Sequence, residues 1–156
     1  MPSHRFTDDD SHLVFSHAVG AILLDSAGRY LLQHRDDKPG IWFPDHWGFF
    51  GGALEAGEEP RAGLARELAE ELGLVVDPAR AAFVMRQAFD LGGLGIGLRW
   101  RHVFALTLGE AEREGLVLAE GAGMRWIDGG EALTALRLAP YDGFALFLHR
   151  ARGRIV

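Results

Sequence analysis

Residues 52–74 read GALEAGEEPRAGLARELAEELGL, a short acidic loop followed by a stretch with the features of one helix. Pro60 suits the first turn of a helix, because its missing N–H has no partner there in any case. Gly73 suits the left-handed residue that follows the last turn. The sequence therefore predicts a helix over residues 60–72, with both of its ends marked.

Glutamates crowd one side of this predicted helix. Glu67 stands three and four positions before Glu70 and Glu71, so the three side chains share one surface. Each like-charge pair at this spacing costs roughly 0.2–0.5 kcal/mol, and carboxylates near the C-terminal end also oppose the helix dipole. Arg66 cannot neutralise all three, so a net acidic cluster remains. Hard oxygen ligands of this kind suit Mg²⁺ or Mn²⁺, which predicts metal-assisted phosphate chemistry.

A Glu-rich helix face is most often an ordinary solvated surface. The loop before the helix is the feature that favours a metal site in this sequence. Gly51 and Gly52 precede the acidic segment 53–58. Glycine lets the backbone approach a metal ion or a phosphate closely. Loop and helix together therefore predict one cradle.

The same stretch resembles the Nudix box, G-x5-E-x7-R-E-U-x-E-E-x-G-U, in which U is an apolar residue. The fixed positions are filled by Gly52, Glu58, Arg66, Glu67, Glu70, Glu71 and Gly73, and the apolar ones by Leu68 and Leu74. The order of strands and helices around the box is also similar to that of the Nudix family. This resemblance implies an α/β/α sandwich with a mixed β-sheet.

Hydrophobic patterning and turn residues predict the other elements. Strands are expected at residues 15–24, 30–33, 47–50, 82–89, 100–108 and 124–127, with a hairpin formed by the first two and a Gly-rich turn over 91–97. Residues 36–46 read as an ordered loop, and residues 131–136 as a short helix. A last, amphipathic helix is expected at 141–152, with an apolar side formed by Phe144, Leu146, Phe147 and Leu148. Such a mixture predicts a mixed sheet packed between helices.

Length and composition predict a single domain over residues 1–156, with residues 1–12 as a flexible polar segment. The chain has no cysteine, which excludes disulfides, thiolate metal sites and cysteine nucleophiles. A net charge of -6 disfavours polymeric nucleic acid as a partner. No secretory signal or membrane span is recognisable, so we expect no membrane partner and a cytoplasmic location. A homodimer is left open.

The resemblance to the Nudix family also implies roles for the box residues. Glu67, Glu70 and Glu71, with the carbonyl of Gly51 or Gly52, would hold Mg²⁺ or Mn²⁺ against a diphosphate. Glu58 would add a ligand through water. Arg66 would orient the glutamates and the loop carbonyls rather than touch the substrate.

The general base has two sources in the family, a box glutamate or a carboxylate from a distant loop. Glu67 is the first choice in this sequence. Glu120, in the Gly-rich loop 118–123, is the downstream alternative. Other downstream candidates are Glu110, Glu112 and Glu114.

Candidate substrate contacts lie in and next to the predicted loop 36–46. Arg35 could meet phosphate, and Trp42 or Phe43 could stack on a base or sugar. Arg99 or Arg101 could also meet phosphate or the leaving group, and two histidines, His34 and His46, could border the site.

We therefore expect an enzyme that cleaves the diphosphate linkage of a nucleoside diphosphate derivative, a small molecule. A nucleoside triphosphate or a nucleotide sugar is favoured by loose family analogy with the loop 36–46. The alternative is a non-catalytic Nudix-fold sensor that binds a nucleotide. Loss of one box glutamate would favour the sensor, and none is lost.

Overall fold

The computed structural model describes residues 16–90 and 97–152 of the chain. The predicted flexible segment 1–12 lies outside these residues, as do residues 91–96 of the predicted Gly-rich turn. In chain order, the elements are β1 (Ser16–Leu24), β2 (Tyr30–His34), β3 (Trp47–Gly48), α1 (Pro60–Leu72), the 3₁₀ turn η2 (Pro78–Arg80), β4 (Ala82–Asp90), β5 (Leu98–Thr107), α2 (Glu110–Glu114), β6 (Gly123–Ile127), α3 (Gly129–Ala135) and α4 (Pro140–Ala151). None of the helices in the described ranges is long and apolar enough to cross a membrane.

The strands form one mixed sheet in the order β3-β2-β1-β5-β4, with β6 paired to β2. Central strand β1 is parallel to β5 and antiparallel to β2, which confirms the predicted hairpin. A strand covered on both faces needs apolar residues on both, and β1 accordingly buries consecutive side chains such as Ala21, Ile22 and Leu23.

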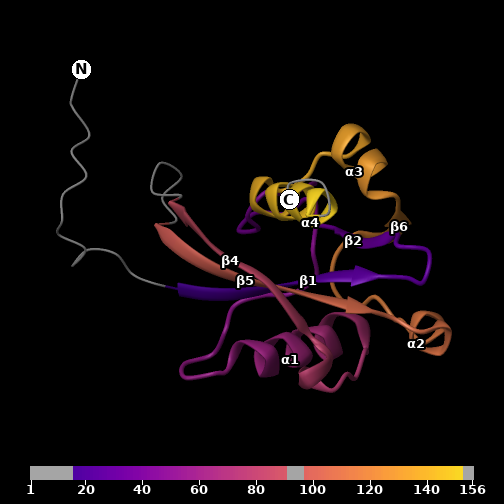
Figure 1. Cartoon of the computed structure of the whole chain (residues 1–156). Helices are drawn as coiled ribbons and strands as arrows, with labels where there is room; N and C mark the ends of the chain where they lie inside the picture. Colours follow the sequence, from indigo (N-terminus) through magenta and orange to yellow (C-terminus); the bar gives the residue numbers. More distant parts are fainter. Residues whose placement is uncertain (1–15, 91–96, 153–156) are drawn as a thin grey trace.

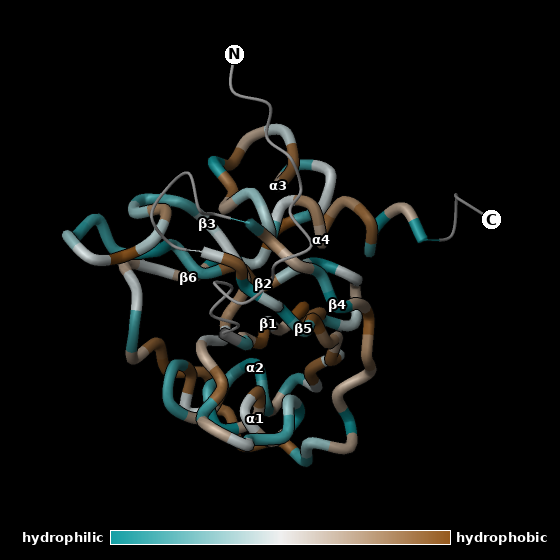
Figure 2. Tube along the Cα trace, turned by 90° about the vertical axis from the view of Figure 1, so that its left-hand side faces the viewer, coloured by the Kyte–Doolittle hydropathy of each residue, from teal (hydrophilic) through white to brown (hydrophobic). Residues whose placement is uncertain are grey.

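Helices cover both faces of this sheet, so the predicted α/β/α sandwich is confirmed. Helix α1 lies on one face and helices α3 and α4 lie on the other (Figure 1). Because side chains alternate along a strand, Val19 and Leu23 pack with Leu68 of α1, whereas Ile22 packs with Leu146 of α4. Figure 2 shows hydrophobic residues gathered around β1 and β5, between the two helical layers.

Helix α1 has the predicted bounds, Pro60–Leu72. Glu59 caps its first turn by accepting hydrogen bonds from the backbone N–H groups of Arg61 and Ala62, at 2.8 and 3.1 Å. Gly73 ends the helix with a φ of 64°. Leucines at positions 64, 68 and 72 are buried against the sheet, which leaves the glutamates between them to face the box loop.

Two regions differ from the predictions. The strand expected at 47–50 is shorter, Trp47–Gly48, because the N–H of Phe49 donates instead to the Asp142 carboxylate at 2.9 Å. Beyond it, Phe50 makes an isolated bridge to Ala21 of β1. Helix α2 and the turn η2 were not expected as regular elements, and the other strands and helices differ from their predicted bounds by one or two residues.

The predicted apolar side of the last helix is wrong in part. Phe144 and Phe147 are 51% and 53% exposed. The face of α4 that packs on the sheet consists of Tyr141, Asp142, Ala145, Leu146 and His149. The hydrophobic pattern did not indicate this face, because two of its residues, Asp142 and His149, are polar and interact with other side chains inside the fold.

His149 is one of these paired polar groups. Its Nδ1 lies 2.8 Å from the Tyr30 hydroxyl, and the Arg152 guanidinium contacts its Nε2. Burial, aided by the positive charge of Arg152, lowers the pKa of His149 to about 4. The unfolded chain has an ordinary histidine pKa of about 6.5, so it takes up a proton on acidification before the folded protein does. We expect the free energy of unfolding to fall by about 2 kcal/mol between pH 7 and pH 5 from this group.

Urea unfolding of wild type and His149→Gln at both pH values measures this contribution. Glutamine keeps a hydrogen-bonding group near Tyr30 but does not titrate in this range. Other groups titrate in both proteins alike, so the variant should show the smaller loss of stability on acidification. An identical loss in both proteins would contradict the assignment.

Candidate functional site

Arg66 of α1 ties the box loop to the helix. Its guanidinium donates to both carboxylate oxygens of Glu58, at 2.9 and 3.0 Å, and to the carbonyl of Ala53 at 3.0 Å. It also donates to Glu67 at 2.8 Å and to Glu70 at 3.2 Å. The hydrogen bonds from Arg66 lower the pKa of Glu58 to about 2. Arg66 thus holds loop and helix together by neutralising carboxylates that would otherwise repel one another.

Glu71 is the buried carboxyl group of the box, with 6% of its surface exposed. It accepts a hydrogen bond from the N–H of Gly51 at 2.7 Å, and the side-chain amide of Gln33 lies 3.4 Å from its other oxygen. Burial raises the pKa of Glu71 to about 7 against the lowering effect of Gly51, and the charges of Glu67 and Glu120 add to the rise. A cation beside Glu71 would favour its charged form.

The loop that carries Glu120 is tied to the same region. Gln33 of β2 donates from its side-chain amide to the carbonyl of Glu120 at 3.0 Å. The N–H of Ala119 donates to the carbonyl of Glu71 at 2.8 Å. Gly121 turns the chain with a φ of 102°, in close contact with Gln33. These contacts hold a distant loop against the C-terminal end of α1.

The carboxylates meet at a cavity of about 230 Å³, which we call the acid cavity. It is lined by Glu67, Glu71 and Glu120 together with Arg35, Gly51 and Gly52. Both glycines are required by space: a Cβ on Gly52 would lie 2.5 Å from a carboxylate oxygen of Glu67, and a Cβ on Gly51 would collide with the carbonyl of Val19. Gly51 also has a φ of 126°, which other residues rarely adopt.

Two of the predicted metal ligands, Glu58 and Glu70, do not line the acid cavity, and Arg66 contacts both. Among the residues that the structure describes, no three acidic or imidazole groups are already arranged as a ligand set. Arg66 also contacts one carboxylate oxygen of Glu67. The donor chemistry nevertheless fits a hard divalent cation, which prefers carboxylate oxygens; it would favour the charged form of Glu71, whose pKa is raised by burial and, to a smaller extent, by the charges of Glu67 and Glu120.

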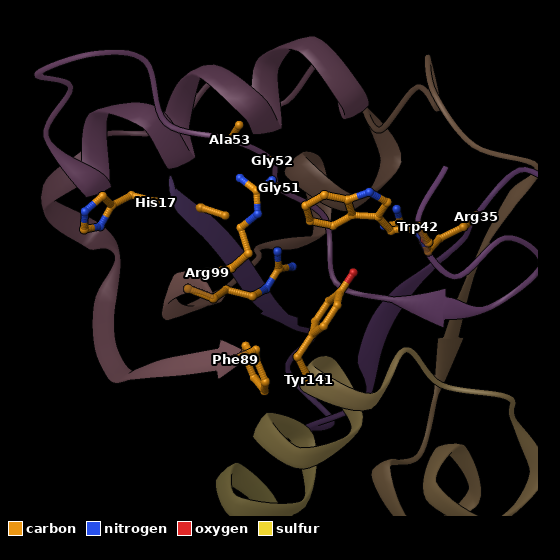
Figure 3. A pocket seen from close by; sticks show the side chains of 11 residues that line it. His17, Arg35, Trp42, Gly51, Gly52, Ala53, Phe89, Arg99 and Tyr141 are labelled. Carbon is orange, nitrogen blue, oxygen red and sulfur yellow. The ribbon is translucent and has the colours of Figure 1, made fainter. Parts of the chain in front are cut away.

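A second cavity, of about 180 Å³, adjoins the first and shares Arg35, Gly51 and Gly52 with it. We call it the aromatic cavity, and Figure 3 shows Trp42, Tyr141 and Phe89 around it together with Arg35, Arg99 and His17. The guanidinium of Arg99 lies over the Trp42 ring, 4.6 Å from its centroid. Arg35 donates to the carbonyl of Trp42 at 2.8 Å. This cavity therefore combines flat walls with positive charge.

One partner of a buried ion pair, Arg101, lines the aromatic cavity. Arg101 of β5 lies 3.1 Å from the carboxylate of Asp142, and both side chains are nearly inaccessible. Burial raises the pKa of Asp142 although Arg101 opposes the rise. Neither Gly20 nor Gly48 could carry a Cβ without meeting this pair, so the sequence makes room for it in β1 and β3.

Several predicted contacts lie elsewhere. The Phe43 ring packs edge-on against Tyr141, with centroids 5.6 Å apart, and lines neither cavity. His34 bonds to Asp45 at 2.8 Å and stacks on Trp47. The other members of this group, which also line neither cavity, are His46, Glu110, Glu112 and Glu114.

Site residues that the sequence did not indicate include Gln33, Tyr141 and Phe89. Gln33 is a polar residue at the end of the buried run Tyr30-Leu31-Leu32, and a polar group in a buried strand needs a partner. That position was the available signal. Tyr141 carried no comparable signal, because its neighbours in the site come from segments far away in the sequence.

Comparison with known proteins agrees with this arrangement. The family model of the NUDIX domain matches residues 14–147. The chain belongs to the Nudix family. The Nudix box named from the sequence thus lies inside a match that spans most of the chain, and the box residues Gly52, Glu67 and Glu71 line the acid cavity.

Individual relatives of this Nudix chain match over shorter stretches. An RNA pyrophosphohydrolase of Gluconacetobacter diazotrophicus is 37% identical over 68 residues, which are 42% of this chain and 41% of that protein. The nucleoside triphosphatase NudI of Escherichia coli is 43% identical over 51 residues, 33% of this chain and 36% of that protein. The chain thus aligns with less than half of the length of these relatives.

Solved structures match over nearly the whole Nudix chain. A MutT protein of Methanosarcina mazei superposes with a TM-score of 0.75 at 19% identity, covering 90% of this chain and 96% of that one. The ORF135 protein of Escherichia coli gives a TM-score of 0.71 at 26% identity, with coverages of 94% and 97%. At such identities the first of these likenesses supports the fold alone.

Proposed function

We propose that this Nudix chain hydrolyses the diphosphate linkage of a nucleoside diphosphate derivative with the help of a divalent metal ion. The observation that carries the proposal is the junction of the two cavities at Arg35, Gly51 and Gly52. The acid cavity suits phosphates and a cation, and the aromatic cavity suits a flat organic group. The names of the relatives, a pyrophosphohydrolase and a nucleoside triphosphatase, support the same chemistry.

Glu67, Glu70 and Glu71, with the carbonyl of Gly51 or Gly52, are the residues that would hold the metal, and Glu58 would do so through water. Bound Mg²⁺ or Mn²⁺ supplies charge that offsets the phosphate oxygens and lowers the pKa of water. Arg66 must share the glutamate oxygens with such a cation, because its guanidinium already contacts Glu67 and Glu70. The further hydrogen bonds of Arg66 to Ala53 and Glu58 would hold its guanidinium in place when a cation is bound.

Glu67 is the proposed general base. It lines the acid cavity, and one of its oxygens faces Gly52. Burial raises its pKa against the lowering effect of Arg66. In the reaction, the water oxygen forms a new bond to phosphorus, the bridging P–O bond breaks, and the water proton passes to the carboxylate. Two phosphate-bearing products leave, and no covalent intermediate with the protein is needed.

Glu120 is the rival base. Its exposed side chain lines the same cavity from a loop that is distant from Glu67 in the sequence. A nucleoside triphosphate or a nucleotide sugar is the proposed substrate class. The complete set of box glutamates favours an enzyme over a nucleotide sensor.

A substrate panel tests the proposal. Nucleoside triphosphates and nucleotide sugars are incubated with the full chain and Mg²⁺, Mn²⁺ or EDTA, and products are separated by ion-exchange chromatography. We expect cleavage at a diphosphate linkage of at least one compound and a loss of about 10²-fold or more with EDTA, because the metal supplies the charge stabilisation. Tight binding without any cleavage would instead indicate a sensor.

A matched calorimetric titration with Mn²⁺ tests the metal site separately. The control protein carries Glu70→Gln and Glu71→Gln, which preserve size but remove two charges. Wild type should bind Mn²⁺ and the double variant should bind it much more weakly. The same isotherm for both proteins would show that the metal, if needed, binds elsewhere.

A further inference from the structure

The polar side chains of the aromatic cavity are nearly all hydrogen-bond donors. Its charged members are guanidinium groups, among them Arg35 and Arg99, and Tyr141 contributes a hydroxyl. Among the residues that the structure describes, none that lines this cavity is Asp, Glu, Asn or Gln. A flat ring bound here would therefore meet donors at its edge and would find no side-chain carboxylate or amide as an acceptor.

Arg35 has donors to spare. Within residues 16–90 and 97–152, the hydrogen bond of its side chain is the one from Nε to the carbonyl of Trp42, at 2.8 Å. That bond fixes the plane of the guanidinium beside the cavity. The remaining N–H groups of Arg35 stay available to an occupant, since Arg35 lines the wall between the two cavities.

Tyr141 has an unused hydroxyl in a rigid setting. The residue is only 7% exposed, and its ring packs against Phe89 and Phe43, with centroid distances of 5.5 and 5.6 Å. Its hydroxyl has no hydrogen-bond partner among the described residues and points towards Trp42 (Figure 3). The hydroxyl oxygen is not among the buried side-chain atoms that lack a partner in the described part of the chain, so it is accessible from the cavity and can donate to an acceptor on an occupant.

The walls of the cavity select for a flat ring. Trp42, Tyr141 and Phe89 present aromatic surfaces, and nucleobases of any kind stack on such surfaces. The volume of about 180 Å³ is many times the space that a single water molecule needs, so a small ring can enter. Stacking alone does not distinguish the bases, so the choice depends on their edges.

The bases differ in what those edges offer. Guanine presents oxygen and nitrogen acceptors on its major-groove edge, and thymine or uracil presents a keto oxygen. Adenine and cytosine present an amino group at the corresponding position. We propose that the aromatic cavity selects nucleotides whose base carries a keto oxygen in place of this amino group, guanine, uracil or thymine, over adenine and cytosine, through Arg35 and the Tyr141 hydroxyl. This inference rests on the proposed function, because it assumes that the occupant is a nucleotide.

Guanidinium groups also attract phosphate, which is the competing interpretation of this cavity. Arg101 contributes little to it, because it is buried and paired with Asp142 at 3.1 Å. The aromatic walls favour the ring, since a phosphate would leave their apolar surface without a partner. Competition by ribose 5-phosphate distinguishes the two.

Equilibrium binding of GMP, UMP, AMP and CMP to the full chain is measured by calorimetry. Monophosphates contain no diphosphate linkage, so turnover cannot interfere. We expect GMP and UMP to bind about tenfold more tightly than AMP and CMP, the discrimination expected from one good set of hydrogen bonds to a base edge. Tyr141→Phe, which removes only the hydroxyl, should reduce that ratio several-fold.

Tyr30→Phe is the matched control, because it deletes the other tyrosine hydroxyl of the chain, which bonds to His149 at a distance from the cavity. It should leave the ratio unchanged. Equal binding of the four monophosphates would overturn the inference, and so would competition by ribose 5-phosphate as strong as that by GMP, which would mark a phosphate subsite. Keto selectivity without cleavage of any substrate would uphold this inference while refuting the proposed function. Cleavage without base selectivity would do the reverse.

Discussion

Glu67→Gln is expected to lower turnover by about 10²–10⁴-fold, the usual contribution of a general acid or base. Glutamine keeps the shape of the side chain and the contact with Arg66, but it cannot take a proton from water. The turnover number is measured under saturating substrate and metal. Mn²⁺ affinity is measured alongside, because Glu67 is also a proposed metal ligand.

Glu120→Gln provides the contrast, since both carboxylates line the acid cavity. If Glu67 is the base, Glu120→Gln should retain most of the turnover. Abolished turnover in Glu120→Gln with intact metal binding, together with a loss of mainly metal affinity in Glu67→Gln, would exchange the two roles. That outcome would leave the family assignment untouched.

Arg66→Ala is expected to lower both activity and stability. The substitution removes hydrogen bonds to three glutamates and to the carbonyl of Ala53, and it leaves the carboxylates to repel one another. Hydrogen bonds to charged groups are worth more than neutral ones, so a loss of about 2 kcal/mol is expected for this partly exposed cluster. For a chain of this size that corresponds to a melting temperature lower by roughly 4–8 °C.

Arg61→Ala is the matched control on the same helix. Arg61 makes a side-chain hydrogen bond to the carbonyl of Ala81 at 3.0 Å and lies away from the acid cavity. Its removal should change the melting temperature less and leave turnover intact. Full loss of turnover in Arg66→Ala, with unchanged stability and metal affinity, would mean that Arg66 contacts the phosphates directly.

Local chemistry made the box helix predictable to the residue. Pro60 and Gly73 act on their own backbone, so their effect is visible without knowledge of the rest of the fold. Sheet order is different in kind, because the pairing of Leu31 with Trp126 joins strands from distant parts of the chain. The sandwich could be predicted from element types and family resemblance, whereas the return of β6 to β2 could not.

Some residues of the site could likewise be predicted from the sequence, and others are brought to it only by the fold. The spacing of Glu67, Glu70 and Glu71 placed them on one side of the helix, but their access to the cavity depends on how α1 rotates against the sheet. The structure turns Glu67 and Glu71 inward and leaves Glu70 outside the cavity. Tyr141 and Gln33 reach the site only through tertiary packing. The roles of all these residues stay predictions until the variants are measured.

The wall shared by the two cavities has a consequence for longer substrates. Arg35, Gly51 and Gly52 belong to both cavities, and Gly51 is fixed by its φ of 126° and its contact with β1. Under the proposed function, the separation between a bound ring and the reacting phosphorus would therefore be set by this part of the backbone. If the proposed function holds, the position of cleavage is fixed relative to the nucleoside. A nucleotide with a longer phosphate chain would be cut at the same number of phosphates from the nucleoside, and its remaining phosphates would extend into solvent.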